Sequence, residues 1–92
     1  MTDEQRSICL AAIDHYGIVH QKRKALEELA ELAVEIAHDL DRQEDRDAIL
    51  EELADVIIMC EQMRIIYGGA RVDRWIRYKT ERLSDRMGGG HE

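Results

Sequence analysis

The chain has 92 residues, the size of one small domain, and a domain this small buries only a modest fraction of its surface as a monomer. It contains no Pro and no Phe, and 36% of its residues are charged, a composition that favours helices. Its net charge of -7 would repel a phosphate backbone, which argues against a nucleic acid polymer as partner. The acids are uneven, because residues 1–62 hold 16 acids and 6 bases whereas residues 63–92 hold 4 acids and 7 bases.

Cysteine usage and hydropathy indicate the compartment. Cys9 and Cys60 are too few and too far apart to form a disulfide framework, and the polar start of the chain does not resemble a signal peptide. No apolar run approaches the roughly 20 residues that span a bilayer. We therefore expect a cytoplasmic protein that associates with no membrane.

Four helices are predicted within one domain of residues 1–87. The first spans about residues 4–15 and ends near Gly17. The second spans about residues 21–40, where apolar side chains recur at the three-and-four spacing of one helical face: Leu26, Leu29, Ala30, Ala33, Ile36, Ala37 and Leu40.

A polar turn at residues 41–47 separates the second helix from the third. Asp45 or Asp47 is suited to cap the third helix, which is predicted over residues 46–67 and ended by Gly68–Gly69. This helix is apolar on nearly all sides, so we expect it to be buried. Part of its surface is expected to lie between subunits, through Ile58 and Ile65 or through Leu50 and Ile57.

The fourth helix is basic and is predicted over residues 71–87, followed by a Gly-rich tail at 88–92 that we expect to be disordered. Lys79 falls on the same stripe as its apolar residues, and Arg82 lies along one flank. These side chains either face a phosphate chain or extend from the helix edge into solvent, as long basic side chains often do.

Two acidic pairs are the main candidates for chemistry. Glu28 and Glu31 are three residues apart on the second helix, and Glu52 and Asp55 are three apart on the third. Residues at this spacing share a flank, so two antiparallel helices would direct four carboxylates toward one point. Such oxygens suit Mg²⁺ or Mn²⁺. The alternative is an ordinary solvated acidic face.

Glu52 favours the metal site. At about 100° per residue, it falls between Met59 and Met63 on the apolar surface of its helix. An ionised carboxylate in such surroundings must be neutralised, paired or bound to a cation. The sequence has no Gly-rich phosphate loop and no nucleophile motif, so metal-assisted attack of water on a phosphate is the chemistry that the acids support.

The acidic pairs resemble a known signature. Glu28-x-x-Glu31, 20 intervening residues and Glu52-x-x-Asp55 are similar to the ExxE…ExxD pattern of the MazG-like all-α nucleoside triphosphate pyrophosphohydrolases. The segments YGIVHQKRKALEELAEL and YKTERLSDR also resemble compact phage and bacterial members of that family. The resemblance covers nearly all of residues 16–86.

The resemblance implies an all-α, four-helix, MazG-like bundle completed by homo-oligomerisation as a dimer or tetramer. It implies Mg²⁺ bound by the four acids, with Mn²⁺ as a substitute, and Glu28 or Glu31 orienting the attacking water. The expected reaction converts a nucleoside triphosphate into a monophosphate and pyrophosphate, a role in nucleotide-pool house-cleaning.

The resemblance further implies substrate contacts by four residues of this chain: Gln21, Lys24, Lys79 and Arg82. One departure concerns Leu83, which stands where some relatives carry Asn, and this affects the expected sugar or base contacts. The alternative function is a non-catalytic helical module that oligomerises or binds nucleotide without turnover.

Overall fold

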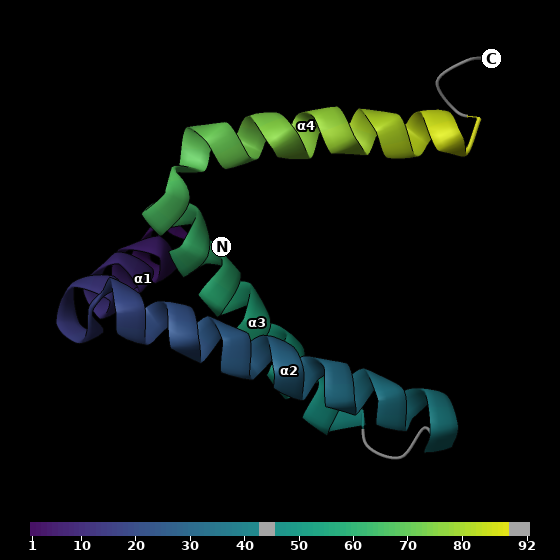
Figure 1. The fold of residues 1–92 in the computed structure, drawn as a ribbon, viewed down its shortest axis with the longest axis horizontal. Coiled ribbons are helices and arrows are strands. Elements are labelled where there is room, and N and C mark those ends of the chain that lie inside the picture. Colours follow the sequence, from purple (N-terminus) through teal and green to yellow (C-terminus); the bar gives the residue numbers. More distant parts are fainter. Residues whose placement is uncertain (43–45, 89–92) are drawn as a thin grey trace.

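The computed structural model describes residues 1–42 and 46–88, and all the regular secondary structure in these residues is α-helix (Figure 1). The four predicted helices are present, and they are α1 (Asp3–Tyr16), α2 (Ile18–Arg42), α3 (Arg46–Tyr67) and α4 (Gly69–Arg86). Asp47 lies inside the first turn of α3 rather than preceding it. The predicted cap at Asp45 and residues 89–92 of the predicted tail lie outside the described residues.

Local sequence signals account for the helix ends. Thr2 caps α1 because its hydroxyl accepts a hydrogen bond from the Gln5 backbone N–H at 3.0 Å, while the Gln5 side chain accepts one from the Thr2 N–H at 2.8 Å. Gly17 separates α1 from α2 with φ of 91°, and Gly68 separates α3 from α4 with φ of 112°. Residues that have a Cβ atom rarely adopt such positive φ angles, whereas glycine does. Each connection between helices can therefore consist of a single glycine. For this reason α2 begins at Ile18, earlier than predicted.

The centre of the fold is the hairpin of α2 and α3 (Figure 1), whose helices pack against each other along most of their length. The buried apolar core of the described chain is small and consists of Cys9, Ala25, Val56 and Met59. A buried hydrogen bond also joins the two helices, since Gln21 Nε2 donates to Gln62 Oε1 at 2.6 Å. This amide pair links one position of α2 to one position of α3.

The orientation of α2 differs from the amphipathic expectation. Its regular apolar stripe is not packed within the chain, and Leu26 and Leu40 at its two ends are 69% and 80% exposed. The side that faces α3 instead carries Gln21, Ala25 and Glu28, all of which are buried. In the described part of the chain α1 packs mainly on α3, and α4 contacts only α3, so neither covers the stripe.

The same holds for α3, which is not buried on all sides in one chain. Leu50 and Ile57 are 59% and 52% exposed. The other helices are too few and too short to surround this helix within one chain, and Leu50 and Ile57 are among the residues expected to lie between subunits.

A chain of ionic contacts fixes the start of α4. Arg64 of α3 donates to both carboxylate oxygens of Asp73, at 3.0 and 2.6 Å, and also pairs with Glu61 at 3.3 Å. Glu61 in turn lies 3.8 Å from Arg6 of α1. Beyond Asp73 the helix extends away from the hairpin (Figure 1), and none of its residues is buried. None of the helices in the described residues combines the length and apolar character of a membrane span.

The glutamine pair yields a stability prediction. Gln21→Ala leaves the buried side chain of Gln62 without its amide partner, which should lower the free energy of unfolding by about 1–3 kcal/mol. Urea titration followed by circular dichroism measures this loss. Arg23→Ala, at an exposed position of the same helix, is the control and should change stability much less. Equal stability of both variants and the parent would show that the amide pair does not stabilise the hairpin.

Candidate metal centre

The α2–α3 hairpin brings the two acidic pairs together. Glu28 of α2 and Glu52 and Asp55 of α3 each place a carboxylate oxygen within 4.8 Å of the others. Glu28 also belongs to a second group with Glu27 and Glu31, whose oxygens satisfy the same limit. Glu28 is therefore the residue common to both groups.

The helix register explains this convergence. Glu28 lies seven residues after Gln21, and Asp55 lies seven residues before Gln62. Because seven residues make about two turns, the hydrogen bond between the glutamines aligns Glu28 with Asp55 in an antiparallel hairpin. The spacing of three then brings the other two acids, Glu31 and Glu52, opposite each other by the same reasoning.

Two carboxylate oxygens in this group are buried without a partner. Glu28 is 6% exposed, and its Oε1 accepts from Lys24 Nζ at 3.1 Å, but its Oε2 has no hydrogen-bond partner. Glu52 Oε2 is buried and unpaired in the same way. Buried polar atoms in folded proteins nearly always have a partner, and a bound cation would satisfy both oxygens. The oxygen chemistry fits a hard cation such as Mg²⁺.

The pKa values of Glu52 and Glu28 reflect the crowding of these carboxyl groups. Loss of hydration raises the pKa of Glu52 to about 7, and the neighbouring acids Glu31 and Glu28 contribute to the increase. The pKa of Glu28 moves in the opposite direction and is lowered, chiefly by its hydrogen bond with Lys24. The two neighbouring carboxyl groups therefore differ, and Glu52 is the one that takes up a proton near neutral pH.

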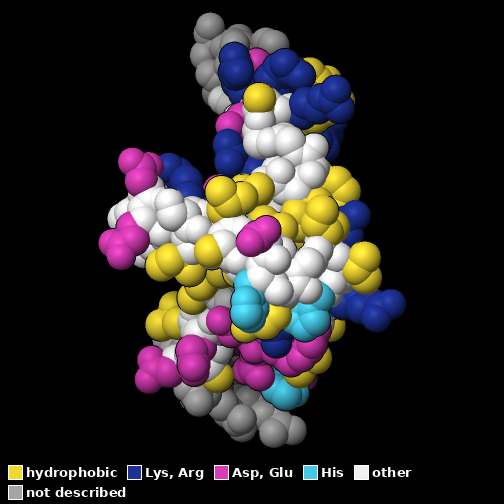
Figure 2. Space-filling model, turned by 90° about the vertical axis from the view of Figure 1, so that its left-hand side faces the viewer, with side chains coloured by type: hydrophobic (Ala, Val, Ile, Leu, Met, Phe, Trp, Pro, Cys, Tyr) yellow, Lys and Arg dark blue, Asp and Glu magenta, His cyan; other side chains and the backbone are white. Residues whose placement is uncertain are grey.

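The acidic group opens to solvent on one side. A cavity of about 310 Å³ adjoins it, lined by Ala30, Glu31, Val34, Glu35 and Glu52. Figure 2 shows acidic side chains over the lower part of the molecule and Lys and Arg gathered over α4 at the top. A ligand can thus reach the carboxylates, but the basic side chains of α4 lie elsewhere on the same chain.

The predicted substrate contacts occupy different environments. Lys24 lies beside the acids, paired with Glu28 and 3.7 Å from Glu27. Gln21 is buried in the amide pair with Gln62. Helical spacing within α2 thus places Lys24 beside Glu27 and Glu28, whereas the hairpin holds Gln21 in the interface between α2 and α3.

The two predicted contacts on α4 lie away from the acids within one chain. Lys79 Nζ lies 5.9 Å from the ring centre of Trp75, and the Arg82 guanidinium lies 5.8 Å from that of Tyr78. Because α4 contacts only α3 in the described residues, and only near its own start, these cations do not join the carboxylates of their own chain.

Sequence reasoning missed two members of this region. Glu27 extends the acidic group, although only its position next to Glu28 could have suggested this. Gln62 sets the register, and its spacing of seven residues from Asp55 was visible in the sequence. That spacing indicates the register only once Gln21 is known to be the partner of Gln62, and the sequence does not identify this partner.

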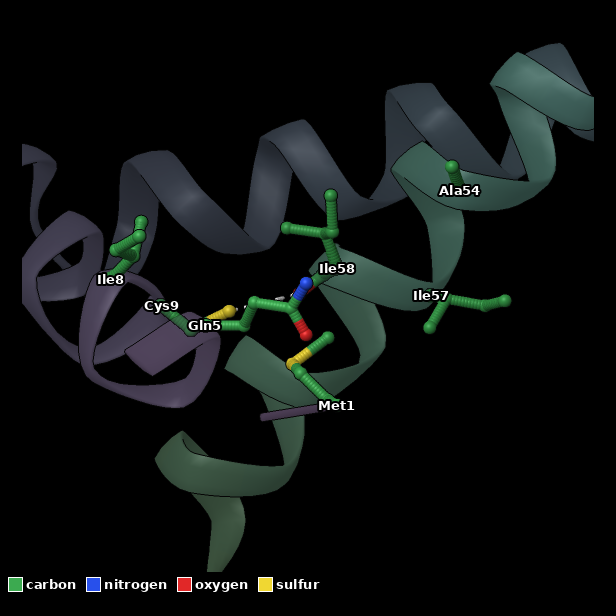
Figure 3. Close-up of a pocket in the computed structure, with 7 residues that line it drawn as sticks. All are labelled: Met1, Gln5, Ile8, Cys9, Ala54, Ile57 and Ile58. Carbon is green, nitrogen blue, oxygen red and sulfur yellow. Dashed lines mark hydrogen bonds between the residues drawn. The ribbon is translucent and has the colours of Figure 1, made fainter. Parts of the chain in front are cut away.

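A second cavity does not share this chemistry. It measures about 460 Å³ and lies between α1 and α3 (Figure 3). Apolar side chains such as Ile8, Ile57 and Ile58 line it, and its Cys9 thiol donates weakly to the Ile58 carbonyl at 3.9 Å. None of the side chains that line it is a carboxylate or a cation, so its chemistry differs from that of the acidic group.

Comparison of the chain with protein-family models, with curated proteins and with solved structures found no match. The resemblance to the MazG-like enzymes therefore rests on the sequence signature alone.

The pKa of Glu52 predicts a pH dependence of stability. Its ordinary value is 4.5, so between pH 4.5 and about 7 the folded protein holds a proton that the unfolded chain has released. The contribution of this group to the free energy of unfolding is full below pH 4.5 and is lost as the pH rises to about 7. Glu52→Gln should remove this part of the pH dependence in urea titrations of the metal-free protein.

Mg²⁺ should increase stability in the pH range where protonation of Glu52 no longer does so. Because an ion at this site would bind the deprotonated carboxylates, its addition should raise the melting temperature more strongly above pH 7 than below it. Glu51→Gln, which removes an exposed carboxylate one residue away, is the control and should keep both behaviours. If Glu52→Gln responds to pH and Mg²⁺ like the parent protein, Glu52 is not a ligand.

Proposed function

We propose that the protein is a Mg²⁺-dependent nucleoside triphosphate pyrophosphohydrolase. The observation that carries this proposal is the pair of buried, unpartnered oxygens, Glu28 Oε2 and Glu52 Oε2, within the group of Glu28, Glu52 and Asp55 that α2 and α3 build. A cation would satisfy such a group, and Mg²⁺ held by carboxylates is the usual companion of substrate phosphates. The resemblance of the two acidic pairs to the MazG-like signature supports the choice of reaction.

The proposed roles follow from the environments of the acids. Glu28, Glu31, Glu52 and Asp55 hold the ion, with Mn²⁺ as a substitute. Mg²⁺, when bound, neutralises charge that develops on the phosphates and lowers the pKa of water. Glu31, which lines the open cavity, is placed to orient the attacking water, and Glu28 is the second candidate for this role. The products are a nucleoside monophosphate and pyrophosphate.

The substrate phosphates carry more negative charge than the metal ion neutralises, so the proposal also needs positively charged side chains. Lys24 is one, since its side chain is 44% exposed and lies next to Glu28. Lys79 and Arg82 are proposed as the others, and they reach the acids from the α4 of a second copy in a homodimer or homotetramer. The charges are complementary, because the acids lie mainly in the first 62 residues and the bases of α4 lie beyond them.

A second candidate function is a non-catalytic helical oligomerisation or nucleotide-binding module. The exposed apolar side chains of α2 and α3 favour self-association whether or not the acids are catalytic. Activity assays separate this candidate from the enzyme.

The proposed reaction predicts its products. With Mg²⁺, a panel of ribo- and deoxynucleoside triphosphates should yield monophosphate and pyrophosphate for at least one member, detected by anion-exchange chromatography and a pyrophosphate assay. The activity should disappear with a chelator and in Glu52→Gln, because the ion is then removed or loses a ligand. Release of diphosphate and orthophosphate would indicate hydrolysis of the γ-phosphate instead.

The role of α4 predicts a kinetic effect. Charge-assisted hydrogen bonds to phosphate contribute roughly 1.5–3 kcal/mol each, so Lys79→Ala should lower kcat/KM about tenfold to a hundredfold. Arg77→Ala on another flank of α4 is the matched control. Metal-dependent stabilisation should survive in both variants, since neither side chain contacts the acids of its own chain. Unchanged kinetics of Lys79→Ala would remove α4 from the active site.

A further inference from the structure

The angle between α3 and α4 encloses a hollow that the acidic group does not use. The two helices diverge from Gly68 (Figure 1), and a cavity of about 340 Å³ lies between them near this joint. Side chains from both helices line it, and residues of the N-terminal segment complete the lining. The lining residues from the two helices are Ile57, Cys60, Glu61 and Arg64 of α3 and Val72 and Ile76 of α4.

Most of these side chains belong to two longer stripes that match each other. Counted outward from Gly68 in the two directions, the residues at equal distances are Val72 and Arg64, Ile76 and Cys60, Lys79 and Ile57, and Leu83 and Leu53. On each helix these residues recur at a spacing of three or four, so they share one face. If α4 packed antiparallel on α3, the two stripes would therefore lie against each other at the same levels.

Two forces favour such packing. Four large apolar side chains of the stripes are about half exposed in the extended position: Leu53, Ile57, Ile76 and Leu83 are 43%, 52%, 52% and 54% exposed. Contact between the stripes would remove them from water. The charges also attract, because α4 carries six bases and three acids, whereas residues 1–62 carry 16 acids and 6 bases.

The joint between the helices opposes full closure. Antiparallel helices are usually connected by roughly two to five residues, whereas α3 and α4 are separated by Gly68 alone. Closure therefore requires the first residues of α4 to leave the helix. This step is undemanding, because Gly69 has a low helix propensity and Gly68 supplies no side-chain cap.

Arg64 opposes the same step by holding the first turn of α4. Its guanidinium donates to both carboxylate oxygens of Asp73, at 3.0 and 2.6 Å, and is anchored on α3 by Glu61 at 3.3 Å. It also lies so close to Gly69 that a Cβ atom at this position would be 2.9 Å from Arg64 Cζ. Exposed ion pairs contribute only modestly to stability, so this contact shifts the balance between two positions rather than forbidding one.

We propose that α4 is an arm that closes onto α3 about Gly68–Gly69, and that the Arg64–Asp73 pair favours the extended position. Closure replaces the hollow by direct contact between the two stripes. One consequence rests on the proposed function: closure sets Lys79 against Ile57, so a closed arm does not offer this cation to the acids of a second copy.

Distances between two spin labels test the closure. Glu51→Cys and Ser84→Cys, in a chain that also carries Cys60→Ala, place the labels 17 residues before and 16 residues after Gly68. The remaining thiol, Cys9, is buried. Double electron–electron resonance, with an excess of unlabelled chain, then measures distances within one chain. Circular dichroism checks that each variant remains helical.

Loss of the ion pair should close the arm. Packed helices lie roughly 8–10 Å apart, so Asp73→Ala should shorten the mean distance between the labels by at least about 5 Å. Glu81→Ala is the matched control, because it removes the same charge from an exposed position of α4, and it should keep the distance of the parent. A distance in Asp73→Ala that equals the parent value, or that only broadens around it, would overturn the proposal.

A second substitution tests whether the stripes make the contact. Ile76→Glu, added to Asp73→Ala, should return the mean distance to the parent value, because closure would then bury a carboxylate. Tyr78→Glu places the same charge on another flank of α4 and should leave the arm closed. Closure that persists with Ile76→Glu would refute contact through the stripes. The measurement involves no turnover, so its failure and the failure of the proposed function are separate results.

Discussion

The packing of α2 against α3 is the interaction on which the rest of this structure depends. Its register is set by a buried hydrogen bond between two glutamines, Gln21 and Gln62. An amide pair specifies an alignment more strictly than an apolar contact does, because a displaced partner leaves a buried polar atom unsatisfied. The same alignment brings Glu28, Glu52 and Asp55 together two turns away. The amide pair therefore positions the acids without touching them.

This arrangement places the acidic side chains between two packed helices of a small protein. The acids occupy the flank of α2 that faces α3, and the apolar stripe of the same helix faces outward. Without a metal, the acidic group is balanced by the ammonium of Lys24 and by the raised pKa of Glu52. Both features describe an excess of negative charge at this site, and a divalent cation of the kind proposed would neutralise it.

The outward stripe and the extended α4 have a common physical origin. A 92-residue chain that consists of one hairpin and two additional helices cannot enclose the acids and also bury all of its apolar side chains. The Arg64–Asp73 pair holds the start of α4, and beyond it α4 extends away from its own hairpin. The surface of α4 and the apolar stripe of α2 are therefore both left uncovered by a single chain. The proposed self-association would cover these surfaces. It also offers a source for the cations that the proposed reaction needs.

Local information in the sequence was sufficient for the all-helical class, the number of helices and the helix breaks at Gly17 and Gly68, because propensity and periodicity act over a few residues. The spacing of the acids predicted that two acidic pairs converge, and the hairpin does bring Glu28, Glu52 and Asp55 together, while Glu31 is grouped with Glu28 on α2.

Tertiary packing decided the remainder. The apolar period of α2 predicted which side chains share a face, but the flank with the buried amide pair and the acids is the one that faces α3. The sequence placed Lys79 on an apolar stripe, whereas only the path of α4 separated it from the acids of its own chain. Periodicity identifies which side chains share a face. Which face is buried depends on the partner that each helix meets, and that partner is remote in sequence or belongs to another copy.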